Sequence, residues 1–230
     1  MKKDKIKVVG MVVAMEKELN PFFEKAGKPF KIYDICGYKI SGYKLFGKKV
    51  FVVKSGIGEI YASSATAILI GVLKCQLILN FGVCGSLVDS VGVLDVVSVK
   101  GVVHYDFDLS PIDDVKVGKY PGYNTPVISV DSASERVDKN IKDLKQVICA
   151  SADKFVADEK IKKNLNKSFG AEVCDMECAG ILLTCKNANV PLVIIKAVSD
   201  GKGGAQEFQN RVKQAVNVYI DVVYKTLKEI

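Results

Sequence analysis

Three acidic side chains stand where apolar, strand-like segments give way to turns or helices. Asp200 closes the apolar run that begins at Val190, Glu18 comes just past the run 8–14, and Glu177 opens a helix-prone segment. In α/β proteins the crevice beyond the carboxyl ends of the strands is the usual ligand site, and carboxyl groups there can donate or accept protons. Each acid alone is typical of a helix terminus or the surface, because negative charge is favoured in a first helical turn. Their convergence on strand ends indicates a chemical site, with Asp200 as the first candidate.

Three glycine-containing segments also follow strand-like runs, at 55–58, 82–86 and 201–204. Glycine lets a ligand approach the backbone and lets backbone amides point at it, so each segment could hold a sugar or a phosphate. None is a P-loop, and none has the Gly-x-Gly-x-x-Gly pattern of dinucleotide-binding folds. Taken singly, each segment favours a tight turn over a ligand site.

Strand-like and helix-like segments alternate along the chain, which predicts an α/β fold. A mixed central sheet sandwiched by helices, in a single domain spanning 1–230, accounts for this order most simply. The stretch 106–126, with its Pro and Gly, predicts an excursion or lid. The predicted strands are 6–14, 38–46, 48–54, 77–81, 93–103, 147–150 and 190–198, with 38–46 and 48–54 forming a hairpin. The predicted helices are 16–23, 60–73, 134–144, 158–169, 179–187 and 206–227.

Composition places the chain among soluble globular proteins. It has 230 residues, of which 49% are hydrophobic and 26% charged. The start imitates a signal peptide but lacks a small-residue cleavage site and runs into Glu16, which favours a first core strand. No apolar stretch approaches the ~18 residues of a membrane span. Seven irregularly spaced cysteines and one histidine favour a cytoplasmic, reducing compartment and argue against a disulfide framework or a metal centre.

The formal net charge of +7 raises the question of nucleic-acid binding. Nearly all of this charge is lysine, since Arg136 and Arg211 are the only arginines. Aromatic residues that could stack bases are not interleaved with the lysines. We therefore expect no nucleic-acid partner. The lysines of one predicted helix are spaced as on a solvated face: Lys160, Lys162, Lys163 and Lys167.

An ordered set of short segments resembles the family of purine nucleoside phosphorylases and nucleosidases, and within it the branch that acts on methylthioadenosine and S-adenosylhomocysteine. Any one segment is weak, but their order across nearly the whole chain is specific. The resemblance implies a three-layer α/β/α sandwich with a central mixed, partly barrel-like sheet, usually assembled as a homodimer. The segments are 14–18, 54–58, 80–85, 105–108, 152–156, 175–177 and 197–200.

The resemblance gives the carboxylates distinct roles. It implies that Asp200 protonates N7 of the leaving purine and that Glu18 activates water. Breaking an N-glycosidic bond places positive charge on the sugar and negative charge on the base, so both groups stabilise the transition state more than the ground state. Glycosidases divide protonation and water activation between two carboxyl groups in a comparable way.

The resemblance also implies a substrate-binding set around these two acids. Glu177 and the Met176 backbone hold the ribose hydroxyls, while Phe155 stacks on the base and the Val156 backbone reads its edge. Val83 and Ser199 complete the implied set. An Asp at position 200, where guanine-selective relatives tend to carry Asn, favours a 6-aminopurine.

Hydrolysis and phosphorolysis differ in whether phosphate is held. Phosphorylases of this family resemble one another in using arginines after the first strand and near the second glycine segment. The corresponding stretches 15–18 and 80–83 contain no arginine, and Glu18 would repel an anion. We expect a hydrolase that needs no cofactor and releases adenine from a methylthioadenosine, S-adenosylhomocysteine or 5′-deoxyadenosine type of nucleoside. The alternatives are a phosphorylase and a catalytically decayed nucleoside-binding protein.

Four departures from the family pattern bear on activity and on the 5′ substituent. Val83 stands in place of a usual Ser or Thr, Tyr105 in place of a common His, and Lys196 in place of a frequent Arg. The loop 201–207 is shorter than usual and lacks the aromatic that often covers the 5′ substituent. The sequence leaves methylthio, homocysteinyl, 5′-deoxy and hydroxyl open at that position.

Overall fold

The computed structural model describes residues 6–131 and 143–230. The predicted helix 134–144 lies outside the described residues except for its last two, and Arg136 lies outside them too. The helices are α1 (Glu16–Ala26), α2 (Glu59–Gly71), α4 (Glu159–Phe169), α5 (Cys178–Ala188) and α6 (Gly204–Glu229). The strands are β1 (Val8–Val13), β2 (Lys31–Ile35), β3 (Tyr38–Leu45), β4 (Lys48–Lys54), β5 (Leu77–Ser86), β6 (Val96–His104), β7 (Ile128–Ser129), β8 (Lys145–Ser151), β9 (Val173–Asp175) and β10 (Leu192–Asp200).

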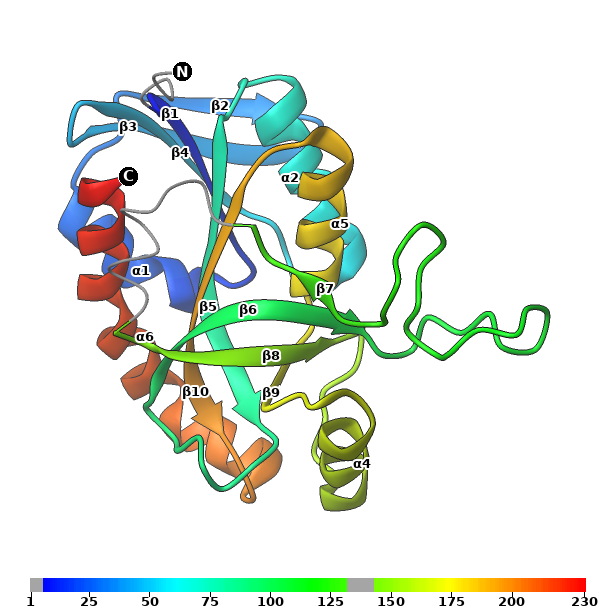
Figure 1. The fold of residues 1–230 in the computed structure, drawn as a ribbon. Coiled ribbons are helices and arrows are strands. Elements are labelled where there is room, and N and C mark those ends of the chain that lie inside the picture. Colours follow the sequence, from blue (N-terminus) through cyan, green and yellow to red (C-terminus); the bar gives the residue numbers. More distant parts are fainter. Residues whose placement is uncertain (1–5, 132–142) are drawn as a thin grey trace.

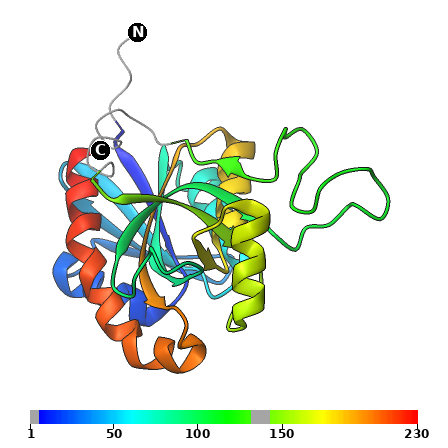
Figure 2. The same cartoon turned by 60° about the horizontal axis from the view of Figure 1, so that its bottom comes forward.

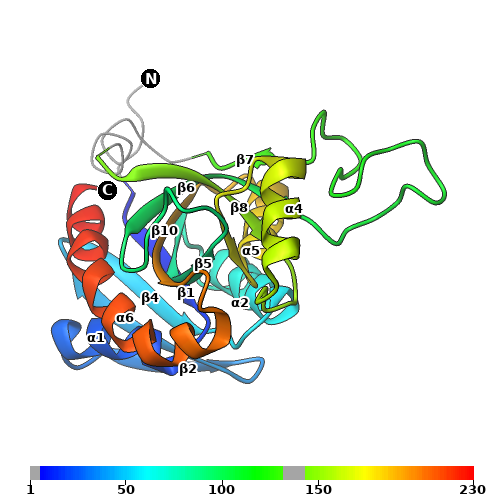
Figure 3. The same cartoon turned by 90° about the horizontal axis from the view of Figure 1, so that it is seen from below.

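The strands form one mixed sheet that closes on itself at one end. Their order is β10-β6-β8-β9-β5-β1-β4-β3-β2, and β10 also pairs with β5. This extra pairing joins β10, β6, β8, β9 and β5 into a ring, which Figure 3 shows from below. The sequence-based expectation of a mixed, partly barrel-like sheet is confirmed.

Helices cover both faces of the sheet, as Figures 1 and 2 show. Helices α1 and α6 lie together on one face, where α6 packs along β10 and β5. Helices α2 and α5 pack against each other on the opposite face. Each face has its own buried apolar cluster, one including Phe22 and Tyr219 and the other Leu69 and Ile181. The predicted three-layer arrangement is therefore confirmed.

Strand β5 runs farther than the sequence indicates. We predicted that it would end at Phe81 and that 82–86 would be a glycine loop, but the strand continues to Ser86 and is buried throughout. Glycine weakens an isolated strand, yet this segment is paired on both sides as the sheet closes. Its partners are β10, up to the pairing of Asp200 with Gly85, and β9, which pairs with Gly85 and Ser86. The second glycine segment is thus a wall of the barrel.

The other elements follow the sequence closely, with three short strands that it did not reveal. Strands β2, β7 and β9 were missed, and all three have five residues or fewer. The stretch 106–126 leaves the body as an irregular excursion in every view (Figures 1–3). Among the described residues, no helix combines the length and the apolar character that a membrane crossing requires.

Helix α4 corrects one expectation about charge. We predicted that its lysines would lie on a solvated face, and Lys160, Lys163 and Lys167 are exposed. Lys162 is buried instead, beside Leu165 on the inner face of the helix. Helical spacing alone placed Lys162 with its exposed neighbours, whereas its burial depends on what α4 packs against.

Candidate active site

A cavity of about 390 Å³ opens at the carboxyl ends of β1, β5 and β10. These strands run parallel, β1 beside β5 and β5 beside β10, so their carboxyl ends share one edge of the sheet. The cavity brings together all but one of the side chains predicted to form the site. Those that line it are Glu18, Val83, Phe155, Met176, Glu177, Ser199 and Asp200.

Val156 is the predicted site residue that does not line this cavity. It is buried in a small apolar cluster with Leu87, Val103 and Leu165. Its neighbour Phe155 lines the cavity and is 42% exposed. Phe155 therefore presents its ring to the cavity, while the side chain of Val156 packs in the core and fixes the segment in place.

Asp200 is the last residue of β10, and its side chain is buried at the cavity wall. Ser199 Oγ donates a hydrogen bond to Asp200 Oδ1 at 2.8 Å. A Cβ at Gly85 would lie 3.1 Å from Asp200 Oδ2, so only glycine leaves the carboxyl its full room. Burial raises the pKa of Asp200 to about 6, with the Ser199 hydrogen bond and the charge of Lys162 opposing it. Such a carboxyl group can hold a proton near neutral pH.

Glu18 is fixed in the first turn of α1 by two backbone amides. Val83 N–H donates to Oε1 and Met15 N–H to Oε2, both at 2.8 Å. A Cβ at Gly82 would lie 2.7 Å from Oε1, which explains the glycine there. Burial raises the pKa of Glu18 above 4.5, while the charge of Lys196 and the two amides act in the opposite direction. The carboxylate thus has a defined position and fixed donors.

Glu177 caps the start of α5 and faces the same cavity. Its Oε1 accepts the N–H of Gly58, at the glycine segment before α2, at 3.0 Å. Burial, followed by the charge of Asp175, raises the pKa of Glu177 to about 8. The 55–58 segment therefore contributes a backbone donor that orients a site carboxylate.

A buried ion pair between Lys196 and Asp175 adjoins the site, and Asp175 itself lines the cavity. Lys196 Nζ lies 2.8 Å from Asp175 Oδ2, and the two side chains are 2% and 1% exposed. Burial opposes both charges, but each partner stabilises the other, so the pKa of Asp175 is lowered and that of Lys196 is raised. Our sequence reasoning noted Lys196 as a replacement but missed Asp175 as its partner. The sequence offers one signal for this residue, because Asp175 stands two residues before the candidate site residue Glu177.

An aromatic residue does reach the cavity from the segment after Asp200. Phe208 lines the cavity, one residue beyond the loop 201–207 that was expected to lack such a side chain. Its ring meets Phe155 edge-on with centroids 5.7 Å apart, and Lys17 Nζ lies 4.4 Å from its centroid. Helix α6 begins at Gly204, so Phe208 lies in its second turn. Because α6 begins so soon after Asp200, its second turn supplies the aromatic side chain that the short loop lacks.

Cys149, Asp175 and Cys178 form the one cluster of metal-type donors found in the described residues, with ligand atoms within 4.8 Å. Burial raises the pKa of the Cys178 thiol to about 11 and that of Cys149 well above 9.0. Metals bind thiolates, and Asp175 is already held by Lys196 and by Ser151 at 2.6 Å. The two protonated thiols therefore pack around an aspartate that is already paired with a lysine.

Residues 8–228 match the sequence profile of the phosphorylase superfamily, and the chain belongs to that superfamily. A 5′-methylthioadenosine/S-adenosylhomocysteine nucleosidase of Buchnera aphidicola subsp. Acyrthosiphon pisum is 32% identical over 192 residues, covering 81% of this chain and 75% of the relative. The family resemblance drawn from the ordered segments is confirmed.

Solved structures share the fold of this chain. A crystal structure of the Helicobacter pylori nucleosidase of the same name superposes with a TM-score of 0.91 at 24% identity, covering 99% of this chain and 100% of that one. A nucleosidase of that name from Colwellia psychrerythraea 34H, in complex with adenine, has a TM-score of 0.87 at 26% identity. It covers 98% of this chain and 96% of its own. The predicted fold class is thus confirmed by structure as well as by sequence.

Proposed function

We propose that this protein is an N-ribosyl hydrolase that cleaves adenine nucleosides of the 5′-methylthioadenosine and S-adenosylhomocysteine type. The products are adenine and the 5′-substituted ribose. The observation that carries the proposal is the meeting of Asp200, Glu18 and Glu177 around one cavity, each oriented by a neighbouring side chain or backbone amide. The nucleosidase relatives support it.

Asp200 and Glu18 divide the chemistry in this proposal. Asp200 transfers its proton to N7 as the bond between C1′ and the purine nitrogen breaks, so adenine leaves as a neutral base. Water adds its oxygen to C1′ and passes a proton to Glu18. Solvent exchange then returns a proton to Asp200 and removes one from Glu18. A pKa of about 6 suits Asp200 to this role, since a donor must hold its proton near the working pH.

Glu177 and Met176 hold the sugar and Phe155 the base in this proposal. Glu177 carries a carboxyl group that can accept from ribose hydroxyls, and the Phe155 ring is open to stack on a purine. Val83 and Ser199 complete the wall, Ser199 by orienting Asp200. Val156 reads the base edge only through its backbone, because its side chain is turned into the core.

Water is favoured over phosphate as the nucleophile. Among the residues that the structure describes, those that line the cavity include no arginine, and Arg211 is exposed on α6 with Gln214 as its partner. Glu18 is anchored where an incoming anion would meet its charge. We therefore prefer hydrolysis to the phosphorylase alternative.

We also infer a homodimer in the cytoplasm. Ile60 and Tyr61 on α2 are 74% and 59% exposed, and the cavity residue Ile57 lies beside them. Apolar side chains grouped in this way are typical of a protein interface. All seven cysteines are free, which suits a reducing compartment. Sedimentation equilibrium would reveal a monomer if the inference about the dimer is wrong.

One assay tests the proposed function against its alternatives. The pure protein is incubated with methylthioadenosine, with and without phosphate, and free adenine and the sugar product are followed. We expect adenine and methylthioribose at a rate that phosphate does not change. A sugar 1-phosphate formed only with phosphate would establish a phosphorylase. Tight binding without release of adenine from any adenosine analogue would establish a nucleoside-binding protein.

A further inference from the structure

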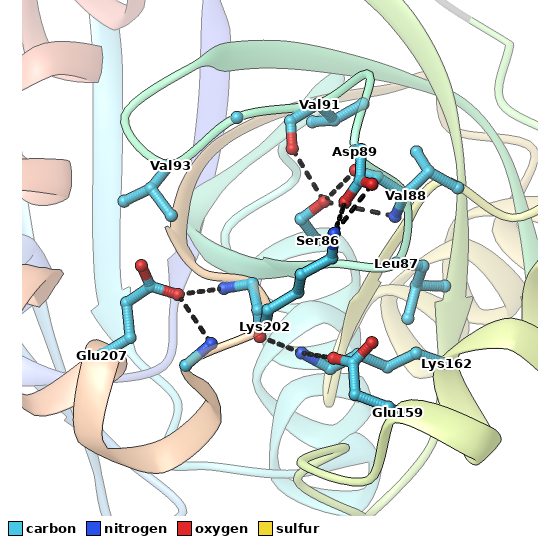
Figure 4. Close-up of a pocket in the computed structure, with 13 residues that line it drawn as sticks. Ser86, Leu87, Val88, Asp89, Val91, Val93, Glu159, Lys162, Lys202 and Glu207 are labelled. Atoms are coloured by element: carbon cyan, nitrogen blue, oxygen red, sulfur yellow. Dashed lines mark hydrogen bonds and ion pairs between the residues drawn. The ribbon is translucent and has the colours of Figure 1, made fainter.

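A second cavity, of about 220 Å³, lies on the other side of the turn that follows Asp200. Asp200 lines the candidate active site, whereas Gly201, Lys202 and Gly203 line this second cavity. Figure 4 shows two charged side chains converging on the turn from opposite sides, Glu207 from α6 and Lys162 from α4. Neither residue has a part in the proposed chemistry.

Lys162 is an unusual residue to find on the buried face of a helix. It is only 3% exposed, and its Nζ donates a hydrogen bond to the carbonyl oxygen of Gly201. Its nearest carboxylate, Glu159 Oε1, is 3.9 Å away on the same helix. Burying an ammonium group is costly unless it is well paired, so a lysine held mainly by one carbonyl adds little to the stability of the fold. The contact instead fixes the backbone immediately after Asp200.

Glu207 holds the same turn from the other side. Its Oε2 accepts the N–H of Gly201 at 2.7 Å and that of Gly203 at 3.2 Å. The first of these N–H groups belongs to the peptide that joins Asp200 to Gly201. The two peptides that follow Asp200 are therefore held by side chains of opposite charge, one through its N–H and the next through its carbonyl.

The two charges also act on the Asp200 carboxyl group in opposite senses. Lys162 lowers the pKa of Asp200 and Glu207 raises it. Among the described residues, Lys17, Glu18, Asp175 and Glu177 line the same cavity as Asp200, and the thiols of Cys84 on β5 and Cys174 on β9 also interact with its carboxyl group. Burial raises the pKa of Cys174 to about 12 and that of Cys84 well above 9.0, so both are neutral. Of the charged groups in the described part of the chain, Lys162 and Glu207 are the two whose charges shift the pKa of Asp200.

We propose that Lys162 and Glu207 are positioning residues for Asp200, clamping the glycine turn behind it and balancing the charge on its carboxyl group. The proposal rests on the assignment of Asp200 as the proton donor. It explains how a short, glycine-rich turn can hold a catalytic side chain steady. It also explains why a lysine is buried at this point of α4.

The test uses two substitutions that act differently on the clamp. Lys162→Met removes both the hydrogen bond and the positive charge, and we expect kcat to fall by roughly tenfold with KM within about threefold. Glu207→Gln keeps an acceptor oxygen but removes the negative charge. Because the donor must be protonated, activity falls as pH rises through the pKa of Asp200. The alkaline limb of the rate profile should move to higher pH in Lys162→Met and to lower pH in Glu207→Gln.

Lys162→Arg retains the positive charge, so the alkaline limb of its pH–rate profile should lie at the wild-type pH. Lys163→Met, an exposed neighbour on the same helix, should match the wild type in rate and pH profile. Thermal melting shows that each variant is folded. The proposal would be overturned if the alkaline limbs of Lys162→Met and Glu207→Gln stayed in place or moved in the same direction. A purely structural role of the two side chains would not shift the two limbs in opposite directions.

A second measurement separates this inference from the proposed function. The titration of Asp200 can be followed by carboxyl carbon NMR, with the signal assigned by its loss in Asp200→Asn. The pKa should rise in Lys162→Met and fall in Glu207→Gln whether or not the protein turns over nucleoside. Inactive wild-type protein with these opposite shifts would refute the hydrolase alone. Active protein without the shifts would refute the clamp alone.

Discussion

Lys196 and Asp175 form an almost completely buried ion pair, with 2.8 Å between Nζ and Oδ2, and Asp175 lines the cavity of the candidate active site. The pair links the end of the short strand β9 to the middle of β10. The charge of Lys196 also favours the ionised forms of Glu18 and Glu177. One cation therefore moderates the repulsion among three buried carboxylates, which makes it central to both stability and electrostatics.

The first prediction concerns this pair. Lys196→Met should lower the free energy of unfolding by roughly 3–5 kcal/mol, because it leaves the Asp175 carboxylate buried without its counter-charge. Urea denaturation monitored by circular dichroism measures the change. Adding Asp175→Asn should recover part of the loss, since the unpaired charge disappears. A single substitution costing less than about 1 kcal/mol would show that the pair is dispensable.

The second prediction concerns the proton donor. Asp200→Asn keeps an acceptor for the Ser199 hydroxyl but cannot protonate N7, so kcat should fall by roughly 10²–10⁴-fold with the fold intact. Release of adenine measures the rate, and the melting temperature reports the fold. Asp221→Asn, on the exposed side of α6, serves as the matched control. Undiminished activity in Asp200→Asn would remove Asp200 from the mechanism.

The acids of the site could be recognised from the sequence because each one stands at a strand end or a helix start. The residues that surround these acids could not be recognised in the same way. Gly82 and Gly85 resembled loop residues, since their need for glycine arises from the close approach of Glu18 and Asp200, which are distant in sequence. Lys162 shared its helical spacing with exposed lysines, but it is buried where α4 meets the turn after Asp200. Such features depend on tertiary contacts rather than on local pattern.

The third prediction is a fall in stability as pH rises. Burial raises the pKa of Asp200 from 3.8 to about 6 and, with the charge of Asp175, that of Glu177 from 4.5 to about 8. A raised pKa in the folded state means that the folded protein binds the proton more tightly. This contribution is complete below the unfolded pKa and is lost as pH rises through the folded value. The free energy of unfolding should therefore decrease between about pH 4 and pH 8.

Urea unfolding at a series of pH values tests this slope. Asp200→Asn should remove the part of the slope between about pH 4 and pH 6, and Glu177→Gln the part that extends to about pH 8, because each deletes one titrating group. Above about pH 6 only the Glu177 contribution of the two remains, which distinguishes the effects of the two substitutions. A wild-type free energy of unfolding that does not fall across this range would mean that these carboxyl groups are ionised in the folded protein without cost.

The fourth prediction concerns Phe208, the aromatic residue of α6 that lines the cavity just beyond the loop 201–207. Phe208→Ala removes the ring that meets Phe155 edge-on, so both the apolar wall and the support of the base-stacking ring are lost. An aromatic pair contributes about 0.5–1.5 kcal/mol beyond its buried area, so KM for methylthioadenosine should rise by roughly tenfold. The value of kcat should change less, because Phe208 is not placed to transfer a proton.

Steady-state kinetics with methylthioadenosine and with adenosine give the sharpest comparison. If Phe208 contacts the 5′ substituent, the penalty should be larger for the methylthio group than for a hydroxyl, because only the former gains from an apolar wall. Phe46→Ala, an exposed aromatic in the turn between β3 and β4, is the control and should leave both KM values unchanged. An equal penalty for the two nucleosides would place Phe208 over the base, where its contact with Phe155 would be its only role in binding.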